Sequence, residues 1–189
     1  YLVDKKNEEI IYDINRAITD LENNVGYRSS FFSYPFGEYS NNFKKIIKDF
    51  GFKYAFGQHS GVVDITKDFY ELPRFPINEK YGDLERFKFL INLSPLQYKS
   101  LNPEDKYITD NNPPELSVEF FKNQKNIKNI NCFSDEGNKW EKSNISFNKN
   151  ILNLNFREKF TFRRGRINCS LNDNGKWRWF GVQFSVNQN

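Results

Sequence analysis

The chain has 189 residues, a formal net charge of +4 and an aromatic content of 17%, enough for the apolar cores of one large domain or two small ones. No apolar run approaches the roughly 20 residues of a membrane helix, and the basic residues are scattered along the chain. We therefore expect no transmembrane segment and no nucleic-acid partner. The start, Tyr1 to Asp4, has neither an initiator methionine nor a signal-peptide pattern, so we expect an N-terminal part of the same protein to be missing.

The first part of the chain shows two helical patterns. Apolar residues recur with helical spacing from Asp4 to Val25, and Gly26 is suited to cap the end of this helix. Ser40 can cap the start of a second helix that ends before Gly51. The predicted apolar face of the second helix consists of Phe43, Ile46, Ile47 and Phe50.

Short aromatic strands are predicted at Ser30 to Tyr34 and at Phe52 to Phe56. The order helix, strand, helix, strand with short loops is typical of a parallel sheet flanked by helices. The loops Tyr34 to Glu38 and Gly57 to Gly61 each follow one strand. We therefore expect both loops at the edge of the sheet where α/β proteins usually hold their active sites.

Arg74 lies in the segment Leu72 to Pro76, where flanking prolines favour an extended backbone and would suit a fixed ion pair. A last helix is predicted from Tyr81 to Leu93, with Leu84, Phe87, Leu90 and Ile91 as its apolar face. The composition then becomes rich in proline and asparagine. We expect an α/β part over residues 1–93, a linker over 94–114 and an all-β, sandwich-like part over 115–189.

In the last part the apolar period changes to two, and Asn174-Gly175 is a strong signal for a type I′ hairpin. A two-residue loop would place Cys169 opposite Phe180 and turn one face of the hairpin toward the core. The predicted core face consists of Ile167, Cys169, Leu171, Phe180, Val182 and Phe184. Trp177 and Trp179 then face outward, where they could stack on sugar rings or pack against the neighbouring domain.

Cys132 and Cys169 show no C-x-x-C spacing and have no histidine beside them, which argues against a metal site. A disulfide between them would suit an exported protein, although two buried thiols would give the same pattern. His59 is the single histidine of the chain, and one imidazole cannot form a histidine-rich metal site. We therefore predict no metal ligands within these 189 residues.

Three segments together resemble the polysaccharide deacetylase family of carbohydrate esterases: Phe32 to Tyr39, Gly51 to Gly61 and Leu72 to Pro76. The stretch from Gly165 to Ser170, followed by Trp177 to Gly181, resembles the β domain appended to a bacterial branch of this family. The resemblance implies that residues 1–93 form the later part of a distorted (β/α) barrel. It also implies removal of acetyl groups from a polysaccharide substrate in the periplasm or outside the cell, with a divalent metal, zinc, whose ligands lie outside this chain.

The resemblance also assigns roles to individual residues. Phe36 matches the aromatic residue whose backbone N–H faces the developing oxyanion, and Tyr34, Pro35 and Gly37 complete that substrate-binding turn. Ser33 stands at or near the position where many relatives carry an arginine that orients the catalytic aspartate.

Arg74 resembles the arginine that another branch of the family uses for this task. His59 could act as the general acid that protonates the leaving amine. Relatives take that histidine from a Leu-x-x-His motif, which this chain lacks.

Two other classes of function fit the same sequence. The chain could be a non-catalytic carbohydrate-binding protein on a deacetylase scaffold, with Tyr34, Phe36 and the Trp177 or Trp179 surface stacking on sugars. It could also be a purely structural interaction domain. An Asp-Asp pair and a His-x-x-x-His pair upstream of Tyr1 would favour the enzyme.

Overall fold

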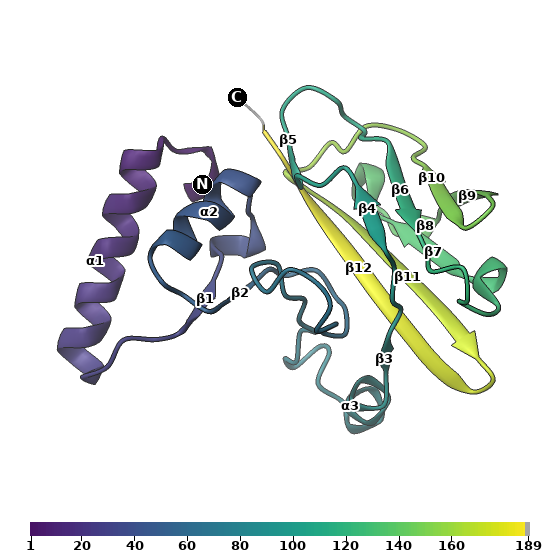
Figure 1. Cartoon of the computed structure of the whole chain (residues 1–189), viewed down its shortest axis with the longest axis horizontal. Helices are drawn as coiled ribbons and strands as arrows, with labels where there is room; N and C mark the ends of the chain where they lie inside the picture. The colour runs from purple at the N-terminus through teal and green to yellow at the C-terminus, as the bar shows by residue number, and fades with distance from the viewer. Residues whose placement is uncertain (188–189) are drawn as a thin grey trace.

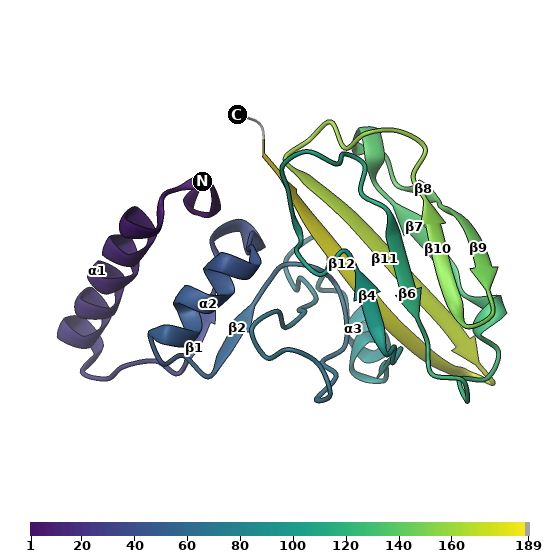
Figure 2. The same ribbon diagram turned by 45° about the horizontal axis from the view of Figure 1, so that its top comes forward.

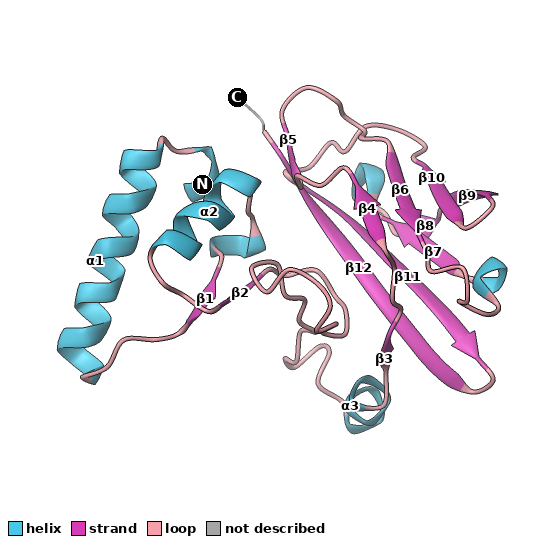
Figure 3. Ribbon diagram, viewed as in Figure 1, coloured by secondary structure: helices cyan, strands magenta, loops and turns pink. Residues whose placement is uncertain are grey.

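The structure is a computed structural model that describes residues 1–187. Helices and a small parallel sheet form the first part of the chain, and antiparallel strands dominate the second part (Figures 1 and 3). Among the described residues no helix is long and apolar enough to cross a lipid bilayer.

The first part contains short elements in the predicted order. These are η1 (Leu2–Asp4), α1 (Asn7–Val25), β1 (Phe31–Ser33), η2 (Pro35–Gly37), α2 (Asn41–Asp49) and β2 (Tyr54–Phe56). Gly26 ends α1 with a left-handed φ of 80°, and the Phe43 N–H donates to Ser40 Oγ at 3.0 Å at the start of α2. Both predicted caps are confirmed.

β1 and β2 pair in parallel, as predicted, with Phe32 opposite Ala55. Leu72 forms an isolated parallel bridge to Phe56 and adds the beginning of a third strand. Residues 1–187 form no closed barrel, because β1 pairs with β2 along one edge only and with no other described strand. The barrel expected from the resemblance is therefore not complete within the described chain.

Helix α3 (Leu84–Ile91) is shorter than predicted, and its predicted apolar face is not buried. Leu84 and Ile91 are each 63% exposed, and Phe87 is also exposed. The contact with the sheet is made instead by Phe89, whose ring centre lies 6.1 Å from that of Trp177. The helix has only two turns, and its aromatic contact with the second part lies at Trp177, near the start of β12.

Two sheets make up the second part, one antiparallel and one mixed, in which β3 and β5 pair with β12 in parallel. The first has the order β4 (Ser100–Asn102), β6 (Leu116–Glu119), β10 (Ile151–Asn155) and β9 (Asn144–Asn148). The second has the order β3 (Ser94–Pro95), β12 (Lys176–Val186), β11 (Arg164–Asp173), β7 (Asn131–Ser134) and β8 (Glu141–Lys142), with β5 (Tyr107–Ile108) paired to β12. Short 3₁₀ helices, η3 (Ile127–Asn129) and η4 (Glu136–Asn138), lie in the connections.

The segment 94–114, predicted as a linker, belongs to this second part. It supplies β3, β4 and β5, and its residues Leu96 and Ile108 are buried in the core between the sheets. Its composition is typical of a loop, but pairing with β6 and β12 fixes its backbone. The change from the first part to the second therefore falls at residue 94, with no free linker between them.

The long hairpin of β11 and β12 has the predicted register, with Cys169 opposite Phe180. Asn174 and Gly175 have φ values of 53° and 87°, which fit the predicted type I′ turn. All six residues of the predicted core face are buried, and the four-stranded sheet covers them in a sandwich-like arrangement (Figure 2). Cys132 of β7 lies directly opposite Cys169 and forms a disulfide with it, which joins β7 to β11.

Candidate functional site

The loops that the sequence predicts to be functional lie against the outward face of β12. Gln183 Nε2 donates to the carbonyl oxygens of Phe36 and Gly37 at 3.3 and 3.2 Å. Two residues earlier, Gly181 leaves room for the next loop, since a Cβ at this position would lie 2.1 Å from the Ser60 carbonyl oxygen. Alternate residues of β12 therefore contact the loops after β1 and β2 in turn.

The tryptophans continue this series along the strand. Trp179 packs edge-on against Phe75, with ring centres 5.9 Å apart, and Trp177 packs against Phe89 of α3. Both rings contact the first part of the chain. Of the two alternatives for these tryptophans, this arrangement matches packing against the neighbouring domain. Each ring thus has an aromatic neighbour from the first part of the chain, and Trp177 remains 37% exposed. The three predicted loops nevertheless lie along one strand.

The turn after β1 holds Phe36 in a left-handed conformation, with φ 57° and ψ 10°. A non-glycine residue in this region is strained by about 1 kcal/mol or more, and such strain is concentrated at functional sites. The amides of Gly37 and Glu38 donate to the carbonyls of Tyr34 and Pro35 at 2.8 and 3.1 Å. Neither of these two hydrogen bonds, which the described chain forms within the turn, involves the Phe36 N–H.

The residues around Phe36 differ in accessibility. Pro35 and Phe36 are exposed, the latter by 52%, and the Arg164 guanidinium lies 5.5 Å from the Phe36 ring centre. Tyr34 is buried, and its hydroxyl donates to the Tyr70 carbonyl at 3.0 Å. Burial raises the pKa of Tyr34. Tyr34 is therefore a core residue in this structure and not a substrate contact.

Gly37 is also buried, and it packs against the loop that follows β2. A Cβ at this position would lie 2.4 Å from the Gln58 amide nitrogen, so glycine allows the two loops to touch. Gly37 thus acts by permitting the turn and not by contacting a substrate. The loops after β1 and β2 open at the same end of the parallel strands, as predicted.

His59 points into the interior and is only 7% exposed. Burial, with a smaller effect of the Lys106 charge, lowers the pKa of His59 to about 4, and its Nδ1 has no hydrogen-bond partner among the described residues. The imidazole is therefore neutral near pH 7. This environment does not support the predicted role as general acid, because a neutral, buried ring is a poor proton donor to a leaving amine.

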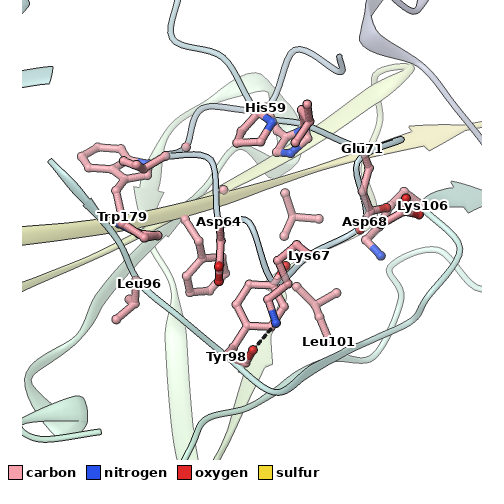
Figure 4. Close-up of a pocket in the computed structure, with 18 of the residues that line it drawn as sticks. His59, Asp64, Lys67, Asp68, Glu71, Leu96, Tyr98, Leu101, Lys106 and Trp179 are labelled. Carbon is pink, nitrogen blue, oxygen red and sulfur yellow. Dashed lines mark hydrogen bonds between the residues drawn. The ribbon is translucent and has the colours of Figure 1, made fainter. Parts of the chain in front are cut away.

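A small cavity of about 50 Å³ lies beside His59, between the two parts of the chain (Figure 4). Lys67 Nζ donates to the Tyr98 carbonyl and lies 3.9 Å from the centre of the Tyr98 ring. Lys106 Nζ donates to two backbone carbonyls, those of residues 103 and 104, at 2.9 and 2.6 Å. The cavity is thus polar but small, and its cations are already satisfied by the protein.

A larger, open cleft of about 520 Å³ lies on the other side of His59. Residues from both parts of the chain line it: Gln58, His59, Ser60, Arg74, Phe75, Pro76, Ile77, Tyr81, Trp140, Arg166, Asn168 and Val182. The Arg74 N–H donates to the His59 carbonyl at 3.1 Å, which fixes the Arg74 backbone at the cleft. His59 and Arg74 therefore share this cleft, and Phe36 lies on the adjoining loop.

The Arg74 side chain itself is exposed. Among residues 1–187 it has no carboxylate within ion-pair distance, so the predicted fixed ion pair is not formed inside the described chain. Trp140 was missed by the sequence analysis, although an isolated tryptophan in a polar segment was the available signal. Its proximity to the first part of the chain depends on how the two parts pack.

The described residues do not fit a metal ion. Residues 1–187 contain no group of three histidine, cysteine, aspartate or glutamate side chains that could hold one. The single histidine is buried beside a lysine, which is an unfavourable place for a cation. No step that depends on a metal can be derived from these residues.

Comparison with known proteins gives one family match. Residues 1–55 match the model of the polysaccharide deacetylase family. No curated protein matches the chain. An endo-β-1,4-mannanase from Thermotoga petrophila is similar in structure with 12% identity and a TM-score of 0.36, over 96% of this chain and 43% of that one. The chain thus spans less than half of that structure, and the family match supports a carbohydrate-active hydrolase of the deacetylase type.

Proposed function

We propose that this chain is the later part of a metal-dependent polysaccharide deacetylase that hydrolyses acetyl groups from N-acetylated amino-sugar polymers. The family match over residues 1–55 includes the strained turn at Phe36. That turn carries the proposal, because it follows a parallel strand, at the end of the sheet where α/β enzymes place their catalytic loops.

In the proposed reaction the Phe36 amide stabilises the oxyanion. Attack on an acetyl carbonyl moves negative charge onto its oxygen, and a fixed N–H donor at that oxygen typically stabilises the transition state by about 3 kcal/mol. Gln183 holds the carbonyl side of the turn, and Gln58 packs against Gly37. The donor would therefore not need to reorganise during the reaction.

Arg74 is proposed to orient a carboxylate from the missing part of the active site. Its backbone is fixed between two prolines and by the hydrogen bond to His59, while its guanidinium is exposed and unpaired within the described chain. An arginine beside a carboxylate base lowers the pKa of that base and fixes its orientation. Because the described residues offer no metal site, the ligands of the proposed zinc would lie upstream.

The first part of the chain has a surface suited to such an upstream segment. The outer edge of β1 pairs with no described strand, and Phe31 on that strand is exposed. Tyr12 of α1 is 70% exposed, and Val25 and Tyr27 at its end are exposed as well. The proposed partner for this surface is the preceding part of the same protein, which would add strands to β1 and extend the sheet.

A non-catalytic carbohydrate-binding protein is the second candidate, and the open cleft favours it. A purely structural interaction domain is the third. The residues preceding Tyr1 in the gene separate the candidates: an Asp-Asp pair and a His-x-x-x-His pair favour the enzyme, and their absence favours the binding protein. Export to the periplasm or beyond is proposed from the substrate class and the Cys132–Cys169 disulfide.

The enzyme proposal is tested on the complete gene product, purified and incubated with an N-acetylated hexasaccharide. The expected result is release of acetate that stops after treatment with a metal chelator and returns on addition of zinc. Acetate release that chelation leaves unchanged would contradict metal dependence, and a complete gene product that binds the sugar without releasing acetate would support the second candidate.

A further inference from the structure

A buried ion-pair network joins the turn at Phe36 to the second part of the chain. Glu38 directly follows that turn and is only 1% exposed. Arg163, which precedes β11, is buried too, and its Nε donates to Glu38 Oε2 at 2.9 Å. Arg164 Nε lies 3.7 Å from the other carboxylate oxygen. Two consecutive arginines of the second part therefore contact the residue that ends the turn.

The Arg163 guanidinium also binds the beginning of the chain. Its Nη2 donates to Asp4 Oδ1 at 2.8 Å, and its Nη1 lies 2.7 Å from Asp4 Oδ2. The Tyr107 hydroxyl of β5 donates to Asp4 Oδ1 at 2.6 Å and so fixes this carboxylate. All three nitrogens of Arg163 are thus used, and a lysine ammonium cannot reproduce such a planar fork.

Strained backbone such as that of Phe36 persists only where surrounding contacts over-determine it. Gln183 supplies one contact, to the carbonyl oxygens of Phe36 and Gly37. Arg163 supplies another, to the side chain of Glu38, the residue that follows the turn. Stability alone is a weak reason for this second contact, because a buried ion pair often stabilises a protein no more than apolar residues of similar volume would. A charged, hydrogen-bonded fork supplies a fixed geometry instead.

We propose that Arg163 is a positioning residue for the Phe36 turn. Through Glu38 it fixes the orientation of the Phe36 N–H, although Arg163 itself touches no reacting atom. The consequence for catalysis rests on the proposed function, whereas the effect on the turn does not. The second part of the chain would thereby complete a site whose donor lies in the first part.

The first measurement needs no activity and uses the 189-residue chain. The N–H groups of Gly37 and Glu38 are hydrogen-bonded within the turn, and their exchange with deuterium, followed by NMR, reports how often the turn opens. Arg163→Lys keeps the charge but not the fork, and it should speed both exchanges at least about tenfold. The hydrogen-bonded N–H of buried Phe120 in the second part reports global opening and should change far less.

Two further variants separate this effect from a general disturbance of buried charge. Glu38→Gln keeps an acceptor for Arg163 without the negative charge, and a smaller acceleration of at least about threefold is expected. Arg157→Lys is the matched control, since Arg157 also joins two carboxylates, those of buried Glu136 at 2.6 Å and Glu141 at 3.2 Å. All three of these residues belong to the second part, so exchange in the turn should not change.

The second measurement is acetate release by the complete gene product. Arg163→Lys should lower kcat at least about tenfold and leave KM within about twofold, because an oxyanion donor acts on the transition state and not on the bound substrate. Adding Glu38→Gln to Arg163→Lys should lower kcat little further, since both residues act through one contact. Arg157→Lys should leave both constants unchanged.

Turn amides that exchange at the original rate in Arg163→Lys or in Glu38→Gln, or a matching acceleration at Phe120, would overturn the proposal. So would an Arg163→Lys enzyme with unchanged kcat, a result that leaves the deacetylase proposal standing. A complete gene product that releases no acetate would contradict the proposed function instead, and the exchange measurement would still decide whether Arg163 holds the turn.

Discussion

Gly181 offers a direct test of how the two parts of the chain meet. Replacing it with alanine would place a Cβ 2.1 Å from the Ser60 carbonyl oxygen and 3.2 Å from the Ile167 carbonyl oxygen. Both contacts are to backbone atoms, one in the loop after β2 and one in β11. Neither backbone can give way without moving a loop or a strand, so the substitution must separate the hairpin from the loop after β2.

The expected cost can be estimated from two opposing effects. Alanine in the middle of a strand would normally stabilise by about 0.5–1 kcal/mol relative to glycine. Overpacking of a tight interior typically costs about 1–3 kcal/mol, and a contact as short as 2.1 Å lies at the upper end. We therefore expect Gly181→Ala to lower the free energy of unfolding by about 2 kcal/mol.

Urea unfolding followed by circular dichroism measures this change through the midpoint and the slope. Gly61→Ala is the matched comparison, because its Cβ would meet Pro73 Cβ at 3.0 Å and the Gly181 nitrogen at 3.4 Å, contacts that need shifts of only a few tenths of an ångström. Its cost should stay below about 1 kcal/mol. Equal effects of the two substitutions, or no effect of Gly181→Ala, would show that β12 does not contact the loop as described.

Three further predictions concern single groups. The one histidine resonance in the NMR spectrum should titrate near pH 4, because His59 is buried; titration at the ordinary 6.5 would show it to be exposed. For the same reason stability should fall as the pH drops from about 6.5 toward 4, where the unfolded chain takes up a proton that the folded chain does not. Arg163→Met would remove the guanidinium that pairs with both Asp4 and buried Glu38, leaving Glu38 only Arg164 at 3.7 Å, and should cost about 3 kcal/mol. That loss should be smaller at pH 5 than at pH 8, because the raised pKa of Glu38 favours its neutral form, and equal losses by urea unfolding would contradict this. Reducing the Cys132–Cys169 bond, which closes a loop of 37 residues, should cost about 3.8 kcal/mol in the chain-entropy model, and an unchanged unfolding midpoint under reductant would refute it.

The features predicted from the sequence are those that depend on local chemistry. Asn174-Gly175 determines the turn, the turn determines the register, and the register determines which side chains enter the core. Ser40 and Gly26 act within one helical turn. The two parallel strands followed from the order of short periodic segments.

The features that the sequence did not predict depend on contacts between distant segments. Proline and asparagine between residues 94 and 114 indicated a linker, but pairing with β6 and β12 makes these residues part of two sheets. The environment of His59 depends on Lys106, which follows it by 47 positions in the sequence. The place of Trp140 in the cleft likewise depends on how the two parts pack, and no local pattern specifies that.

The loops along β12 are proposed to belong to the active site of a polysaccharide deacetylase, and Arg74 tests this most directly. In the complete gene product, Arg74→Ala should reduce the rate of acetate release from an N-acetylated oligosaccharide about a hundredfold, a loss of about 2.7 kcal/mol in transition-state stabilisation. The exposed Arg16→Ala should leave that rate unchanged. An Arg74→Ala protein that releases acetate at the original rate would contradict the claim.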